Sequence, residues 1–148
     1  MTVNQQIVAV FSIFHDGTII SWAGDKMKLT LTIDCQYLAE RIDKTFDRFY
    51  IELSQIDELH FSTWPNPIDL PEQTLTEISE IFKPELEILT ADSIDNKVVI
   101  AFSLYDTNFD YCGGILTISC SSIKILDQKE KEITIDELTE ISNKYWDE

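Results

Sequence analysis

The sequence has few of the residues that catalytic and metal sites use. Its 148 residues include only two histidines, three cysteines and four glycines. The histidines, His15 and His60, stand 45 positions apart with no HxxxH pattern, and no two cysteines form CxxC. Four scattered glycines cannot build the phosphate-binding pattern GxGxxG or GxxxxGK. We therefore predict no metal, no cofactor and no catalytic residue, and the chain is more typical of a binding protein than of an enzyme.

Long apolar runs are missing as well. No stretch approaches the ~20 apolar residues that a membrane helix needs. The N-terminal MTVNQQIVAVF has no basic segment and no small-residue cleavage site, so it is not typical of a signal peptide. An odd number of cysteines favours free thiols in a reducing compartment. With 44% hydrophobic residues, we expect one folded domain spanning residues 1–148, in the cytoplasm and away from membranes.

Positively charged side chains are few in this chain. Eleven Lys and Arg oppose 27 Asp and Glu, for a formal net charge of −16. The excess is uneven, because residues 51–100 hold eleven acidic residues against two basic ones. Such a field repels nucleic acid and accelerates encounter with a basic protein. High solubility is the simpler interpretation of the same charge.

The clearest pattern lies at the N-terminus, where residues 6–14, 18–22 and 27–35 alternate or run apolar as strands do. Asp16-Gly17 and Gly24-Asp25 are suited to two-residue turns. Those turns would pair Trp22 with Met27 and would place one apolar face on the meander. That face comprises Phe11, Ile13, Ile20, Trp22, Met27, Leu29, Leu31 and Ile33.

His15 and Asp16 are the first pair to weigh as a site. A catalytic base needs an orienting partner, yet neighbouring strand residues point to opposite faces. Asp16 would therefore be poorly placed to hold His15, and its carboxylate would bind the turn backbone instead. We interpret His15 as a structural residue at the end of a turn, with a binding contact as the alternative.

The rest of the chain predicts more antiparallel strands and two helices. Strands are expected at residues 48–53, 58–63, 85–90, 97–105, 114–120 and 122–126, with a turn at Asp95-Asn96. Helices are expected at 69–82 and 134–146, each opened by a capping box, Asp69 with Glu72 and Thr134 with Glu137. This is an α+β fold, mainly an antiparallel sheet of about eight or nine strands with two amphipathic helices. The pentamer LTEIS occurs at 75–79 and 138–142, which suggests two similar ββββα halves, about 5–83 and 84–148.

Residues 106–112 form a polar loop with aromatic side chains. Asp106, Asn108 and Asp110 match part of a calcium loop, but no glutamate follows at the required place, so an ordinary loop is favoured. Tyr105, Phe109 and Tyr111, together with Trp64 beside a proline turn, could either form an exposed anchor patch or plug the end of a sheet. Both interpretations stay open.

Two segments carry a resemblance to a known group of proteins. Phe14, His15 and Asp16 form "FHD" after an apolar stretch, and a late strand-like segment reads GGILTISCSSIKI. In these features the chain resembles small acidic bacterial proteins, some of them described as immunity proteins of secreted polymorphic toxins. The resemblance covers about a quarter of the chain. It implies a toxin-binding role without catalysis, and it carries no binding residues.

Two functional hypotheses follow. The first is a protein-binding module, of the kind an immunity-type inhibitor would be, which docks a basic protein through an acidic surface drawn from residues 52–95 and the second helix. Its candidate contacts are His15, Asp16, Trp64, Asp106, Phe109, Asp110 and Tyr111. The second is a small-molecule-binding or enzymatic domain with a pocket at the sheet end near His15, Thr18 and Trp22. A homodimer is compatible with either.

Overall fold

The architecture is known from a computed structural model, which describes residues 1–147. Within them the chain forms one ten-stranded antiparallel sheet and four helices, two of them seven residues or longer, which confirms the predicted α+β class. The helices are α1 (Val3–Ile13), α2 (Gln36–Ala39), α3 (Ile78–Ile81) and α4 (Ile135–Trp146). The strands are β1 (Thr18–Gly24), β2 (Lys28–Asp34), β3 (Arg48–Ser54), β4 (Glu58–Pro65), β5 (Thr74–Leu75), β6 (Leu86–Ile94), β7 (Lys97–Ser103), β8 (Tyr111–Ser119), β9 (Ser122–Leu126) and β10 (Glu132–Ile133).

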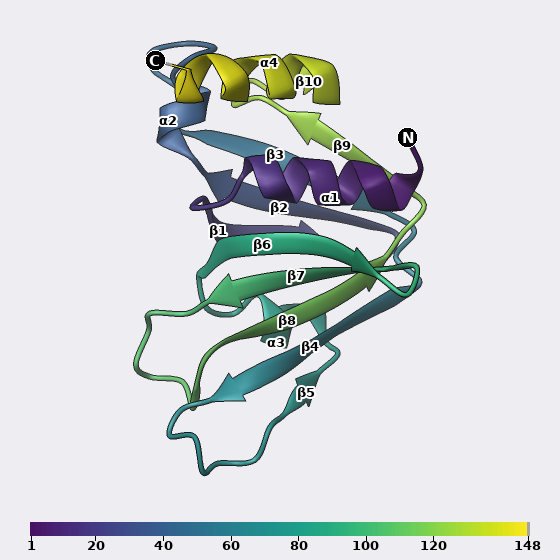
Figure 1. Ribbon diagram of the computed structural model, residues 1–148, viewed down its shortest axis with the longest axis vertical. Coiled ribbons are helices and arrows are strands. Elements are labelled where there is room, and N and C mark those ends of the chain that lie inside the picture. Colours follow the sequence, from purple (N-terminus) through teal and green to yellow (C-terminus); the bar gives the residue numbers. More distant parts are fainter. Residues whose placement is uncertain (148) are drawn as a thin grey trace.

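The order of the strands is symmetric. It runs β10-β9-β3-β2-β1-β6-β7-β8-β4-β5, so exchanging β1 to β5 for β6 to β10 reverses it (Figure 1). Each set of five strands is followed by a helix, α3 or α4. The repeated pentamer does not share this symmetry, because its first copy begins in β5 and its second lies wholly within α4. A common origin of the two halves stays a prediction.

The sheet bends between β3 and β4 and, beside it, between β8 and β9. The segment β3–β4 pairs with the segment β8–β9, and together they form a long antiparallel ribbon. At the bend, the N–H of Asp57 donates to the Ser119 carbonyl and the N–H of Ser121 donates to the Ser54 carbonyl. At the centre of the strand order, β1 of the first five strands and β6 of the last five pair only through Thr18 with Glu87 and Ile19 with Leu86. The two halves therefore share one hydrophobic core.

Alternate residues of the strands fill that core. β2 buries Leu29, Leu31 and Ile33, as its alternation predicts, and β3 buries Phe49, Ile51 and Leu53 directly opposite. α1 lies in front of the sheet in Figure 1, packs mainly on β6 and adds Ile7, Val10, Phe11 and Phe14 to the core. The rings of Phe14 and Phe49 meet with centroids 5.0 Å apart.

The prediction of a strand at residues 6–14 is wrong, because this segment is the second half of α1. Thr2 and Gln5 form a reciprocal capping box that starts the helix. The buried positions 7, 10, 11 and 14 have helical spacing. A run of Val, Ile and Phe is compatible with a helix or a strand, and here packing of the segment against the sheet favours the helix.

The turn and register predicted near it change accordingly. Asp16-Gly17 does not join two strands but links α1 to β1, with Asp16 at φ 70° and its N–H bonded to the Ile88 carbonyl. In the β1–β2 hairpin, Trp22 pairs with Leu31 rather than with Met27, across a longer loop and a bulge near Ile19. Met27 is 68% exposed, so it is not part of the apolar face.

The two predicted helices have different outcomes. α4 begins at the predicted Thr134–Glu137 capping box and is confirmed. The helix predicted for 69–82 is wrong, because Leu75 and Thr74 pair with β4 and only Ile78–Ile81 remains helical. The turn at Asp95-Asn96 is confirmed, with both residues at positive φ, 52° and 63°.

Candidate functional site

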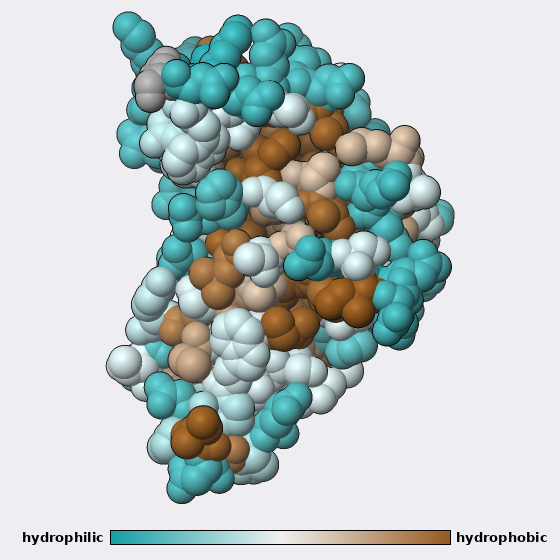
Figure 2. Space-filling model, viewed as in Figure 1, coloured by the Kyte–Doolittle hydropathy of each residue, from teal (hydrophilic) through white to brown (hydrophobic). Residues whose placement is uncertain are grey.

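Two adjoining hollows form an acidic cleft at the sheet end where β1 and β6 begin, and they meet at Thr18. The molecule is visibly hollowed on its left side in Figure 2, at the height of these strands. The first hollow, about 550 Å³, is lined by Asp16, Thr18, Asp34, Cys35, Gln36, Tyr37 and Glu40. The second, about 370 Å³, is lined by Thr18, Glu85, Glu87, Tyr105 and Asp106.

Strand register brings the central residues of this acidic cleft together. Thr18 lies directly opposite Asp34 of β2 on one side and Glu87 of β6 on the other. Residues paired in this way project from the same face, with Cβ atoms about 5 Å apart. Two carboxylates thus flank one small hydroxyl at the single point where the two halves of the sheet are hydrogen-bonded through β1 and β6.

The lining carries six carboxylates and no Lys or Arg. Among residues 1–147, the only ion pair that any of the six makes is the one between Asp16 Oδ2 and His15 Nε2, at 3.8 Å. The other five are Asp34, Glu40, Glu85, Glu87 and Asp106. The cleft is therefore a concentrated negative site that the protein itself leaves largely uncompensated.

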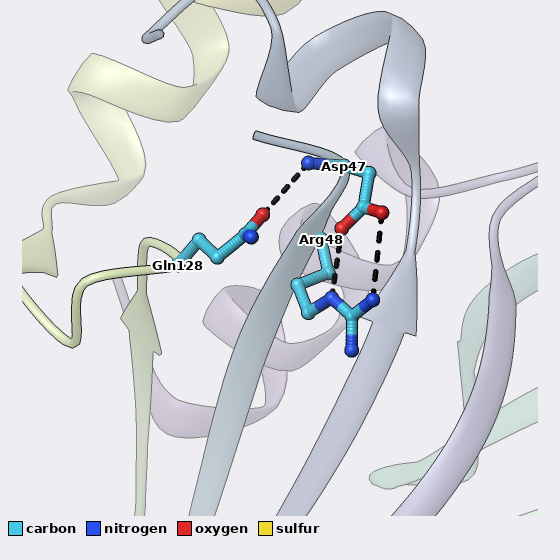
Figure 3. Close-up of polar contacts among 3 residues, drawn as sticks. All are labelled: Asp47, Arg48 and Gln128. Atoms are coloured by element: carbon cyan, nitrogen blue, oxygen red, sulfur yellow. Dashed lines mark hydrogen bonds and ion pairs between the residues drawn. The ribbon is translucent and has the colours of Figure 1, made fainter. Parts of the chain in front are cut away.

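Arg48 forms its ion pair with its neighbour Asp47, which does not line the cleft. Its Nε lies 2.7 Å from Asp47 Oδ1, and its Nη2 is 3.4 Å from Oδ2 (Figure 3). This pairing holds the pKa of Asp47 below its usual value and raises that of Arg48. The N–H of Asp47 donates to the side-chain oxygen of Gln128 at 2.7 Å, which ties the start of β3 to the turn after β9 (Figure 3). Arg48 lies directly opposite Asp34 in the β2–β3 register and interacts with it electrostatically, but its ion pair is with Asp47.

A buried thiol, Cys35, and a tyrosine, Tyr37, line the first hollow. Burial raises the pKa of the Cys35 thiol to about 11, so Cys35 stays protonated at neutral pH. Burial also raises the pKa of Tyr37, whose hydroxyl donates to the His15 carbonyl at 2.9 Å. Both groups therefore keep their protons at neutral pH. On the opposite side, Tyr105 is 77% exposed and offers an aromatic face beside the carboxylates.

His15 lies behind the cleft rather than in it. Its Nδ1 donates to the Ser12 carbonyl at 2.9 Å, and its ring stacks on Trp146. Asp16 Oδ2 comes within 3.8 Å of His15 Nε2, while the hydrogen bond that orients the ring goes to the Ser12 carbonyl. The two residues occupy a helix-to-strand turn instead of the expected consecutive strand positions. Asp16, by contrast, does line the cleft.

The candidates around residues 106–112 separate into three groups. Asp106 lines the cleft, and its Oδ1 accepts the N–H of Asn108 at 2.9 Å. Phe109 packs edge-on against Tyr111, which is buried beside Phe61, so these two rings close the end of the sheet. Trp64 stays partly exposed, and Asp110 contributes its carbonyl to the N–H of Asn66.

The sequence did not indicate most of the cleft. Asp34, Tyr37, Glu40, Glu85 and Glu87 were not predicted as site residues, whereas Thr18 and Tyr105 were candidates for a pocket and for an aromatic patch. Glu85 and Glu87 alternate with Leu86 and Ile88, which places them on the outer face of a strand. That signal could have shown which way they point, although not that β6 begins beside β1.

The predicted pocket near His15, Thr18 and Trp22 is divided in the structure, and of the three residues only Thr18 lines the acidic cleft. His15 lines a small hollow of about 300 Å³ between α1 and β6. Trp22 lines another, about 440 Å³, with Met27, Ile78 and neighbouring polar residues. Among the residues described, no group of three or more His, Cys, Asp and Glu is arranged to hold a metal ion.

No protein-family model, curated protein or solved structure matches this chain. Within residues 1–147, none of the helices has the length and apolar character needed to cross a membrane.

Proposed function

We propose that the protein is a binding module for a basic protein, and that the acidic cleft receives Lys or Arg side chains of that partner. The observation that carries the proposal is the row Asp34, Thr18, Glu87, which aligns two carboxylates that form no ion pair with a Lys or Arg of residues 1–147. A guanidinium or ammonium entering there gains charge-assisted hydrogen bonds.

Two further features support this proposal. The net charge of −16 would steer a basic partner toward the protein over distances of about a Debye length. Tyr105 stands exposed at the cleft, where a cation could also contact its ring. An immunity-type inhibitor of a basic toxin is one protein of this class, in line with the resemblance described above.

The proposal is tested with a hexa-arginine peptide and isothermal titration calorimetry at about 150 mM salt, where exposed charges are screened beyond about 8 Å. The cleft variant is Asp34→Asn/Glu85→Gln/Glu87→Gln. The control variant, Asp92→Asn/Asp95→Asn/Glu130→Gln, removes three carboxylates outside the cleft, so both lose the same net charge.

We expect the cleft variant to bind the peptide at least about tenfold more weakly, and the control to change by less than about twofold. Equal weakening by both variants would mean that only the overall field attracts the peptide. A cleft variant that binds as well as the wild type would refute the proposed site.

A small-molecule site is the second candidate, favoured by the hollow at Trp22. Its wall combines the Trp22 ring with Met27 and the nearly buried Ile78, next to Lys26 and Glu77. Such a surface suits a flat apolar ligand with a polar group. Enhancement of 8-anilinonaphthalene-1-sulfonate fluorescence that disappears in Trp22→Ala, but not in Trp64→Ala, would support this candidate. Equal enhancement in all three proteins would refute it.

A further inference from the structure

The loop of residues 65–73, between β4 and β5, projects from the end of the molecule and carries an unusually exposed apolar side chain. Figure 1 shows it as the outermost segment at the bottom of the view. Ile68, near its tip, is 91% exposed. Trp64 and Leu70, next to the loop and within it, are also classed among the exposed large apolar residues. Single apolar side chains are common on surfaces, whereas here three exposed ones lie within seven positions of the sequence, and Trp64, Ile68 and Leu70 are together called the patch below.

The backbone of this loop is conformationally restricted. Three of the four prolines of the chain, Pro65, Pro67 and Pro71, lie in it and restrict its backbone. The N–H of Leu70 donates to the Pro67 carbonyl at 3.1 Å, which closes a turn with Ile68 and Asp69 at its centre.

Hydrogen bonds also fix both ends of this loop. Thr63 and Gln73 exchange two of them, N–H to carbonyl and N–H to Oγ1, each 2.9 Å long. The N–H of Asn66 donates to the Asp110 carbonyl at 2.9 Å, which joins the loop to residues 104–110. A side chain presented on such a support loses little conformational entropy when it binds.

The surroundings of this patch are acidic. Residues 65–73 contribute Asp69 and Glu72, residues 104–110 contribute Asp106 and Asp110, and neither segment contains Lys or Arg. Asp106 also lines the acidic cleft, so the second loop connects the cleft to the patch. The partner surface that fits this combination is an apolar pocket with a basic rim.

We propose that Ile68 is an apolar anchor, which enters a hydrophobic pocket rimmed by Lys or Arg on a basic partner protein. The inference rests on the proposed function, to which it adds a second contact and the shape of the partner's surface. We take a basic protein rather than a second copy of this chain as the occupant, because two molecules of net charge −16 repel and the residues around the patch are acidic.

The test uses the photoreactive residue p-benzoylphenylalanine, placed at position 68 in the full chain and expressed in the source cells. The same residue at position 94 is the control, because Ile94 is another exposed isoleucine, 55% accessible, in the β6–β7 hairpin. Mass spectrometry identifies the cross-linked protein and the peptide attached. That protein is then purified, and its Kd is measured with Ile68→Ala, Ile68→Asp and Ile94→Asp.

We expect a basic protein cross-linked at position 68 and not at 94. Ile68→Ala should weaken its binding about tenfold or more, Ile68→Asp further, and Ile94→Asp by less than twofold. The absence of a cross-link at position 68, a cross-link to a second copy or to an acidic protein, or unchanged affinity of the Ile68 variants would each overturn the anchor.

The cleft variant Asp34→Asn/Glu85→Gln/Glu87→Gln separates this inference from the proposed function. If it weakens binding of the identified partner while the Ile68 variants do not, the cleft stands and the anchor falls. If only the Ile68 variants weaken binding, the anchor stands and the cleft is not the docking site.

Discussion

The imidazole of His15 stacks on the indole of Trp146, with ring centroids 5.5 Å apart and planes 17° from parallel. This contact joins the end of α1 to the last turn of α4, segments from opposite ends of the chain. Trp146 also meets Tyr145 and Tyr37, and the Tyr145 ring lies under the guanidinium of Arg41. The aromatic cluster holds α4 beside α2, whose first residues line the acidic cleft.

Trp146→Ala should therefore loosen the end of α4. The substitution removes a stacked contact of a ring that is 54% exposed, so the expected loss in free energy of unfolding is about 1 kcal/mol. Urea unfolding followed by circular dichroism gives that number, and hydrogen exchange of the last turn of α4 should become faster. Ile94→Ala, at a comparably exposed position, is the control. Equal losses in both variants would show that the cluster contributes nothing specific.

Thr134→Ala should destabilise the protein by about 1 kcal/mol. The Thr134 hydroxyl accepts the N–H of Glu137 at 3.1 Å and completes the capping box of α4. Thr139→Ala makes the same chemical change inside the helix, where the hydroxyl only donates to the Ile135 carbonyl, and it should be nearly neutral. Thermal unfolding of the two variants in parallel tests this difference in stability, and similar melting temperatures would contradict the prediction.

Cys35 should make the protein sensitive to alkali. Burial raises the pKa of its thiol from 9.0 to about 11, so between these pH values the unfolded chain has lost a proton that the folded chain keeps. Stability therefore falls as pH rises from about 9 to 11, by about 2–3 kcal/mol from this group. Cys35→Ala should lack that part of the decline, whereas Cys112→Ala, at an exposed thiol, should keep it. Denaturant unfolding at pH 8 and 10.5 measures the difference, and parallel curves for all three proteins would exclude Cys35 as the cause.

Asp127→Ala should be the most damaging single-carboxylate substitution in the β9–β10 turn. Asp127 is buried, and its Oδ1 accepts the N–H groups of Lys129 and Lys131 at 2.8 and 3.0 Å. Removing the acceptor leaves two donors unpaired, at an expected cost of about 1–3 kcal/mol. Asp127→Asn should retain more stability, because its amide oxygen can still accept. Urea unfolding of both variants beside Asp92→Ala tests this, and no loss in Asp127→Ala would show that water replaces the carboxylate.

Much of the sheet was predictable because its signals are local. The Asp95-Asn96 turn and the alternation of Leu29, Leu31 and Ile33 depend on a few neighbouring residues, and they were found. α1 was not, because its apolar run satisfies a strand as well as a helix and the Thr2–Gln5 capping box was overlooked. Of the acidic cleft, the sequence indicated only Asp16, Thr18, Tyr105 and Asp106 as candidates, and it assigned them to different sites. The cleft forms because β1 pairs with β6 through Thr18 and Glu87, 69 positions apart, and no local pattern reports such a pairing.

The sequence by itself determined the α+β class, the excess of negative charge, the capping of α4 and the lack of metal-ligand spacings, because each depends on composition or on residues within a few positions. Only the tertiary structure decided that β1 meets β6, that Thr18 stands between Asp34 and Glu87, and that the 65–73 loop projects beside residues 104–110. These outcomes follow from how ten strands bury one shared core, and that packing free energy is summed over the whole chain.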